Sequence, residues 1–124
     1  MDIAKTIAMS SKSKRKKVGC IIVKQNNIIA IGYNGTPSGF NNNCEKNGVT
    51  KKEVLHAESN AISKCSKSTY SSEGATMYVT LSPCIECSKL IIQSGIKRLF
   101  YNEKYRDDEG LKLLKKAKIK CYEI

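Results

Sequence analysis

One histidine and two cysteines are spaced so that they could hold a metal ion. His56 is the only histidine in the 124-residue chain, and Cys84 and Cys87 follow it as a Cys-x-x-Cys pair. Two cysteines three residues apart at the start of a helix can face one point, and a helix N-terminus favours the thiolate that binds metals. A zinc ion with three protein ligands keeps one position open for water, which is typical of catalytic zinc. The spacing therefore indicates a catalytic zinc site.

Glu58, two residues after His56, is the carboxylate best placed to serve such a water. Two thiolates and a neutral imidazole cancel the charge of Zn²⁺, so the ion is a weak Lewis acid and a carboxylate should help to deprotonate the water. Residues two apart on a helix do not face each other. His56 and Glu58 can therefore flank one water only if the metal lies off the first turn of the helix.

These residues also have simpler interpretations. A single histidine near a helix start is more often an ordinary surface or core residue, and a Cys-x-x-Cys pair also occurs in redox pairs and in structural zinc ribbons. A ribbon needs two further ligands, for which Cys44 and Cys65 are the spare candidates. The combination is more specific than its parts, because His-x-Glu followed by Pro-Cys-x-x-Cys is the pattern of zinc nucleobase deaminases. We therefore favour the catalytic interpretation.

The elements that must position these residues alternate between strands and helices. Hydrophobic periodicity and end signals predict helices over 2–9, 54–66 and 107–116, and one opened by Ser82-Pro83 and closed by Gly95. Runs of β-branched residues predict strands over 18–23, 28–33, 75–80, 96–101 and 119–124. The first two strands form a hairpin and the later ones are joined by helices. This order predicts an α/β fold with a partly parallel sheet.

Residues 34–48 are rich in Gly and Asn and contain a Pro, so we expect an irregular loop there. A loop of this length is unusual in a compact domain, which favours a functional role.

Composition limits the classes of protein that fit. The 124 residues suit a single domain over 1–124, and the net charge of +11 favours an anionic partner, although lysines also serve solubility. No apolar run is long enough to span a bilayer, and no signal peptide precedes the basic run at 12–17. We therefore expect no membrane partner and a cytoplasmic location (the host cytoplasm if the source is viral), where cysteines stay reduced.

Several segments resemble a known family. His56-Ala57-Glu58 and the segment 80–87, Thr-Leu-Ser-Pro-Cys-Ile-Glu-Cys, resemble the cytidine/deoxycytidylate deaminase superfamily. The segments 18–23 and 32–39, the latter Gly-Tyr-Asn-Gly-Thr-Pro-Ser-Gly, are similar to those of deoxycytidylate (dCMP) deaminases, including phage-type members. The resemblance implies a three-layer α/β/α fold around a five-stranded mixed sheet.

The resemblance also implies the reaction, which is hydrolysis of dCMP to dUMP and ammonia, feeding thymidylate synthesis. By the family mechanism, His56, Cys84 and Cys87 bind Zn²⁺, and Glu58 passes protons as a zinc-activated water attacks C4 of cytosine. Asn34 would hold the sugar 3′-hydroxyl. The other implied substrate contacts are Arg15 and Tyr105 near the phosphate, with Ala57 and Ser82.

Regulation and assembly are implied in the same way. Members of the family are typically hexamers that dCTP activates and dTTP inhibits, usually with Mg²⁺ bound to the triphosphate. The residues expected to carry effector binding here are Gly32, Tyr33, Gly35 and Thr36.

Two other functions remain open at this stage. A nucleic-acid deaminase of the tRNA adenosine type could use the same zinc site, and the net charge favours it, but the 32–39 loop and the eight aromatic residues argue against it. A non-catalytic zinc-stabilised binding module is the second, although it would have no use for Glu58. The roles of Cys20, Cys44, Cys65 and Cys121 stay open, with helix packing favoured for Cys65.

Overall fold

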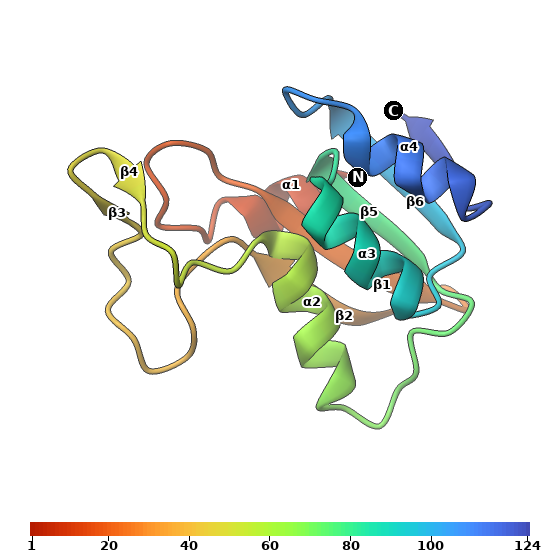
Figure 1. Cartoon of the computed structure of the whole chain (residues 1–124). Helices are drawn as coiled ribbons and strands as arrows, with labels where there is room; N and C mark the ends of the chain where they lie inside the picture. Colours follow the sequence, from red (N-terminus) through yellow and green to blue (C-terminus); the bar gives the residue numbers. More distant parts are fainter.

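The computed structural model describes residues 1–124 and shows a five-stranded mixed sheet between two layers of helices (Figure 1). The strands are β1 (Gly19–Lys24), β2 (Asn27–Tyr33), β5 (Thr76–Leu81), β6 (Arg98–Glu103) and β7 (Lys120–Glu123). Their order is β2-β1-β5-β6-β7; β1 is antiparallel to β2 and β5, whereas β5, β6 and β7 are parallel. The predicted α/β class with a mixed sheet is confirmed.

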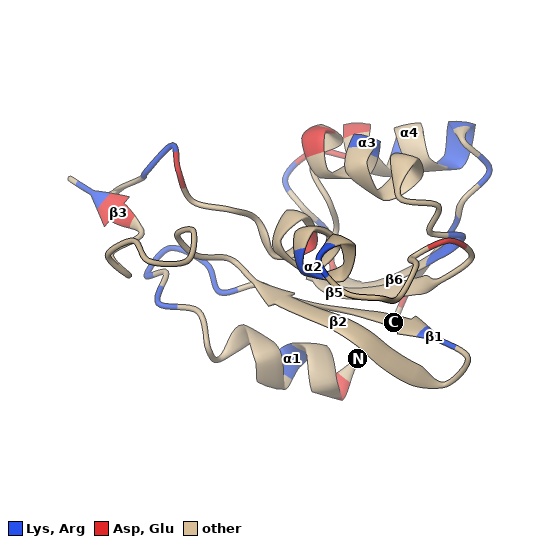
Figure 2. Ribbon diagram, turned by 90° about the horizontal axis from the view of Figure 1, so that it is seen from below, with Lys and Arg blue, Asp and Glu red and all other residues tan.

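Four helices cover the sheet. They are α1 (Asp2–Ala8), α2 (Ala57–Ser66), α3 (Ile85–Gln93) and α4 (Glu109–Lys116). Figure 2 shows α1 on one face of the sheet and α2, α3 and α4 on the other. None of the four combines the length and the apolar character that a membrane-spanning helix needs.

The core lies between the sheet and the layer of α2, α3 and α4. Alternate residues of the central strand β5, Met77 and Val79, are fully buried against this layer, and Ile91 of α3 and Leu114 of α4 meet them from the helices. Cys20 and Cys65 belong to the same buried cluster, which agrees with a packing role for Cys65.

Gly32 lets α2 lie directly on the sheet. A Cβ atom at this position of β2 would collide with the backbone of Ala57 and Ala61 in α2. With glycine below and two alanines above, helix and strand approach closely and no flexible side chain separates them. The N-terminal turn of α2, which follows His56, is therefore held firmly against the sheet.

Two helices begin later than the periodicity predicts. α2 begins at Ala57 rather than at 54, so His56 is its N-cap with extended backbone angles (φ −75°, ψ 159°). α3 begins at Ile85, and Cys84 is its N-cap with φ −71° and ψ 171°. The predicted capping role of Ser82 is wrong, because its hydroxyl accepts a hydrogen bond from the Tyr105 amide instead. The other element ends lie within two residues of the predicted ones.

The segment between β2 and α2 is more regular than expected. It contains a two-stranded hairpin of β3 (Glu45–Lys46) and β4 (Val49–Thr50), so the prediction of an irregular loop over 34–48 is wrong in part. Asn47 and Gly48 between the strands both have positive φ angles, which suits the tight turns of two-residue hairpins. Gly35 and Leu55 pair by two backbone hydrogen bonds and close the base of the segment.

Candidate active site

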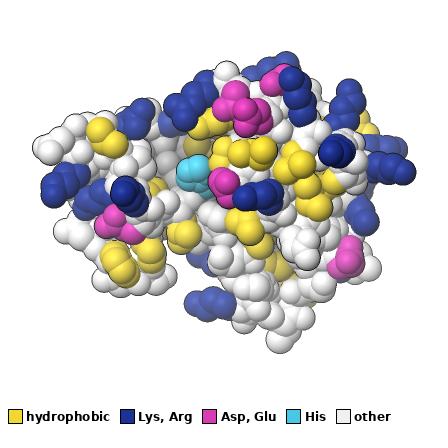
Figure 3. All heavy atoms as spheres, viewed as in Figure 1, with side chains coloured by type: hydrophobic (Ala, Val, Ile, Leu, Met, Phe, Trp, Pro, Cys, Tyr) yellow, Lys and Arg dark blue, Asp and Glu magenta, His cyan; other side chains and the backbone are white.

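A cavity of about 310 Å³ lies beyond the carboxyl end of β5. The segment before β1, the end of β2, the first turn of α2 and the loop after β6 also line it. The carboxyl ends of parallel strands are where α/β sheets bind ligands. In Figure 3 the one histidine, His56, is visible at the surface in the hollow beside α2.

His56 and Cys84 line this cavity, and Cys87 lies beside them. The Nδ1 atom of His56 lies 3.5 Å from Sγ of Cys84 and 3.4 Å from Sγ of Cys87, and the three ligand atoms lie within 4.8 Å of one another. A tetrahedral zinc ion with ordinary bond lengths sets a sulfur and a nitrogen ligand about 3.6 Å apart. Both the donor set and these distances therefore fit zinc. No further His, Cys, Asp or Glu joins the group.

The two helix starts explain the convergence. His56 and Cys84 are the N-caps of α2 and α3, and Cys87 lies one turn into α3. The exposed amides of a helix N-terminus favour negative charge, including thiolates. Hydrogen bonds from the Cys87 thiol and from His56 lower the pKa of Cys84 to about 3, whereas the neighbouring Cys84 sulfur and burial raise the pKa of Cys87. Both effects favour the thiolate form of Cys84, which is the form that binds metals.

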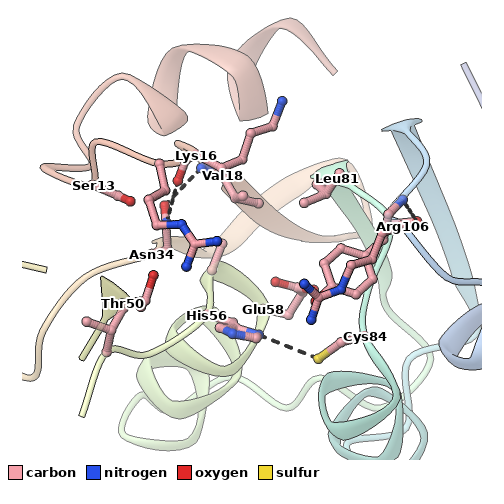
Figure 4. Close-up of a pocket in the computed structure, with 15 residues that line it drawn as sticks. Ser13, Lys16, Val18, Asn34, Thr50, His56, Glu58, Leu81, Cys84 and Arg106 are labelled. Carbon is pink, nitrogen blue, oxygen red and sulfur yellow. Dashed lines mark hydrogen bonds between the residues drawn. The ribbon is translucent and has the colours of Figure 1, made fainter. Parts of the chain in front are cut away.

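Glu58 lies in the first turn of α2, is 4% exposed and lines the same cavity. Burial raises the pKa of its carboxyl group to about 7. Because His56 precedes the helix with an extended backbone, the imidazole and the carboxylate reach one cavity although the residues are only two apart. Both side chains therefore border the space that a shared water would occupy (Figure 4).

All five residues expected to contact substrate line this cavity, namely Arg15, Asn34, Ala57, Ser82 and Tyr105. The side chain of Asn34 is oriented by the backbone beside it. Its Oδ1 accepts a hydrogen bond from the Val18 amide (2.8 Å), and its Nδ2 donates one to the Lys16 carbonyl (2.7 Å). One lone pair and one hydrogen of the amide group remain for a ligand.

The cavity also holds cations that the sequence did not single out. Arg106 enters from the loop after β6, opposite Ser13 and Asn34 (Figure 4), and its guanidinium carbon lies 5.2 Å from the ring centroid of Tyr105. Lys16 is paired with Glu103 at 2.9 Å, whereas Arg15 and Arg106 have no ion pair with a carboxylate. Among 22 basic residues only its place next to Tyr105 could have indicated Arg106.

Three of the four residues expected to bind effectors line a second cavity of about 310 Å³: Tyr33, Gly35 and Thr36. Lys64 and Lys67 of the α2 end line it as well, and Lys64 Nζ lies 5.5 Å from the ring centroid of Tyr33. The fourth residue, Gly32, lies beneath α2 and does not reach this cavity.

Comparison with known proteins places these features in a family. Residues 1–103 match the family model for the cytidine and deoxycytidylate deaminase zinc-binding region. The deoxycytidylate deaminase of Saccharomyces cerevisiae is 37% identical over 130 residues, which cover 96% of this chain and 41% of the yeast protein. That of Enterobacteria phage T4 is 35% identical over 147 residues, with 85% and 76% covered. The chain thus spans less than half of the yeast relative.

Solved structures agree. The dCMP deaminase of the cyanophage S-TIM5, in complex with dCMP and dUMP, superposes with a TM-score of 0.97 at 42% identity, covering 99% of this chain and 92% of that one. A deaminase that edits adenosine to inosine at the wobble position of transfer RNA is less similar, with a TM-score of 0.61 and 26% identity over 85% of this chain and 75% of that one.

Proposed function

The chain belongs to the cytidine and deoxycytidylate deaminase family, and we propose that it hydrolyses dCMP to dUMP and ammonia. One observation carries the proposal: a single cavity brings together a zinc-type ligand group, a buried carboxylate and two arginines without acidic partners. The first two suit hydrolysis of an amine, and the arginines suit a phosphate.

The chemistry divides between the metal and Glu58. His56, Cys84 and Cys87 would hold a zinc ion, which would supply an activated water for the attack. The carboxylate of Glu58 accepts a proton from the attacking water and passes it to N3 of the cytosine ring. Glu58 then takes the remaining proton of the former water from the hydroxyl group on C4 and delivers it to the amino group, so that the C4–N bond breaks, the C4 carbonyl forms and ammonia leaves. Its burial excludes bulk water from these transfers.

The nucleotide is oriented by the remaining residues of the cavity. Asn34 has one donor and one acceptor free for the 3′-hydroxyl of the sugar. The planar guanidinium groups of Arg15 and Arg106 can each bind the 5′-phosphate through two hydrogen bonds. Ser82 holds the backbone of Tyr105 and so fixes the loop that carries Arg106. Ala57 contributes to the cavity wall.

The replacement Arg15→Ala tests the phosphate contact. Hydrogen bonds to charged groups contribute about 1.5–3 kcal/mol, so we expect the KM for dCMP to rise about 10- to 100-fold. The KM for deoxycytidine, which has no phosphate, should change far less. The control is Lys17→Ala, which removes a cation of the same basic run that does not line the cavity. Equal effects of Arg15→Ala on both substrates would remove Arg15 from the phosphate site.

Ammonia release from a substrate panel tests the function itself. We expect the zinc-loaded chain to deaminate dCMP promptly and to leave transfer RNA and single-stranded DNA unchanged. Turnover of transfer RNA without turnover of dCMP would favour the nucleic-acid deaminase. Zinc binding without turnover of any substrate would favour a binding module.

Regulation and context complete the proposal. We propose that dCTP and dTTP bind, with Mg²⁺, in the second cavity. Lys64 and Lys67 would face the triphosphate there, and Gly35 and Thr36 would form part of the cavity wall. A homo-oligomer, in the form of a hexamer, would carry the coupling between sites. The product dUMP would feed thymidylate synthesis. We place the reaction in the cytoplasm, whose reducing conditions would keep the cysteines from forming disulfides, so that they can bind zinc. The rate of dCMP deamination, measured with and without dCTP and dTTP, tests the control by effectors. Analytical ultracentrifugation tests the hexamer.

A further inference from the structure

The carboxylate of Glu45 holds the loop that carries Arg15. Its Oε2 atom accepts hydrogen bonds from Ser13 Oγ at 2.9 Å, from the Lys14 amide at 3.0 Å and from the Arg15 amide at 3.3 Å. Three donors on one oxygen form a small anion-binding nest, and here an acidic side chain of the same chain fills it. Glu45 is 30 residues from Arg15 in sequence. It lies on strand β3, in the segment between β2 and α2 (residues 34–56), which we call the excursion.

The loop needs such a partner because its own charges repel one another. Residues 12–17 read Lys-Ser-Lys-Arg-Lys-Lys, so five cations crowd into six positions. Apart from Glu45, the one acidic contact to this run is the ion pair between Lys16 and Glu103. Unlike the cations of the run, which are exposed, Ser13 is only 4% exposed. Its backbone amide donates a hydrogen bond to Ser11 Oγ, which holds it on the side away from Glu45. A carboxylate at the centre therefore offsets part of the positive charge of the run and fixes its backbone.

The direction of the fixed loop matters for the cavity. Ser13, Arg15 and Lys16 line the cavity, although the side chains of Arg15 and Lys16 are exposed. Hydrogen bonds to two consecutive amides set the backbone from which the Arg15 side chain departs. A long side chain that is already oriented loses less conformational entropy when it binds a phosphate.

We propose that Glu45 is a positioning residue for substrate binding, which holds the Ser13–Arg15 backbone so that the Arg15 guanidinium meets the 5′-phosphate of the nucleotide. This inference rests on the proposed function. Glu45 touches neither the metal group nor the reacting ring, and it lies outside the buried core. Its effect should therefore fall on phosphate recognition and not on the folding of the domain.

The test compares Glu45→Ala with Glu45→Gln. We expect Glu45→Ala to lower about tenfold the ratio of kcat/KM for dCMP to kcat/KM for deoxycytidine. Glu45→Gln should lie between this variant and the parent, because its amide oxygen still accepts hydrogen bonds but lacks the charge. Glu53→Ala is the matched control, since Glu53 is an exposed carboxylate of the same excursion with no ion pair.

Two further measurements separate positioning from a general structural role. In an Arg15→Ala background, Glu45→Ala should lower the ratio no further, because residues that act through one another are not additive. The backbone amides of Lys14 and Arg15 should exchange hydrogen faster in Glu45→Ala than in the parent, and this readout needs no turnover.

The outcomes distinguish this inference from the proposed function. If the parent chain fails to deaminate dCMP, the proposed function fails, while amide exchange still reports whether Glu45 holds the loop. If the parent deaminates dCMP and Glu45→Ala keeps the parental ratio, or loses activity equally on both substrates, the positioning role is overturned.

Discussion

Replacing Glu58 by Gln is expected to slow the deamination of dCMP by about 10²- to 10⁴-fold, which is the usual contribution of a general acid–base group. Gln has nearly the same size, so the buried position in α2 stays filled, but an amide cannot pass protons between water, ring and leaving group. Glu58 is not one of the metal ligands. The variant should therefore still bind one zinc ion per chain, as measured by metal analysis beside steady-state kinetics.

Glu86→Gln is the control for this experiment. Glu86 lies between the two cysteine ligands in sequence, but its side chain is exposed and pairs with Lys89 in α3. It should keep both the zinc content and the rate of the parent. A parental rate in Glu58→Gln would remove Glu58 from the chemistry and favour another proton carrier.

Replacing Cys87 by Ala is expected to abolish both zinc binding and turnover. Cys87 is 3% exposed and is one of the three proposed ligands, so its loss should leave too few donors for tight binding. Metal binding to the folded state alone also stabilises it, by about 4 kcal/mol when free zinc is a thousandfold above Kd. A chelator should therefore lower the Tm of the parent chain by roughly 15 °C and leave that of Cys87→Ala nearly unchanged.

Cys121→Ser controls for the loss of a thiol in general. Cys121 lies in the edge strand β7, away from the metal group, so this variant should bind zinc and respond to the chelator as the parent does. A chelator effect of equal size on Cys87→Ala and on the parent would mean that the metal binds elsewhere.

The order of strands and helices could be predicted from the sequence, because each element has its own periodicity. The β-branched runs indicated all five strands of the main sheet, and Gly95 with its positive φ angle does follow the end of α3. The grouping of His56, Cys84 and Cys87 could also be predicted, since their residue types and spacing are rare in combination.

The helix starts could not be predicted in the same way. Neither His56 nor Cys84 makes a side-chain capping hydrogen bond, so no local signal marks them as N-caps. Their extended backbones depend on how α2 and α3 pack on the sheet, which is a tertiary property. Ser82 resembles an N-cap residue for α3 when only its neighbours in sequence are considered. Its hydroxyl instead accepts a hydrogen bond from the backbone amide of Tyr105, 23 residues further along the chain.

Contacts between distant segments were missed for a similar reason. Arg106 and Glu45 are single charged residues in a chain with 33 of them, and their roles appear only when the loops after β6 and within the excursion are placed beside the cavity. Sequence periodicity carries no information about such pairs.

The backbone hydrogen bonds between Gly35 and Leu55 bring the two ends of the segment 36–54 together, and Leu55 directly precedes His56. Because the ends already meet, the entropy of closing this segment depends only weakly on how long it is. The whole excursion can thus be grafted from one relative to another without moving the imidazole. Such a transplant would exchange Glu45, with its proposed hold on the Arg15 loop, and Thr50 and Val54 of the cavity wall, while His56, Glu58 and the two cysteines stay in place. If Glu45 acts as proposed, affinity for the phosphate can change while the proposed metal ligands and Glu58 stay the same.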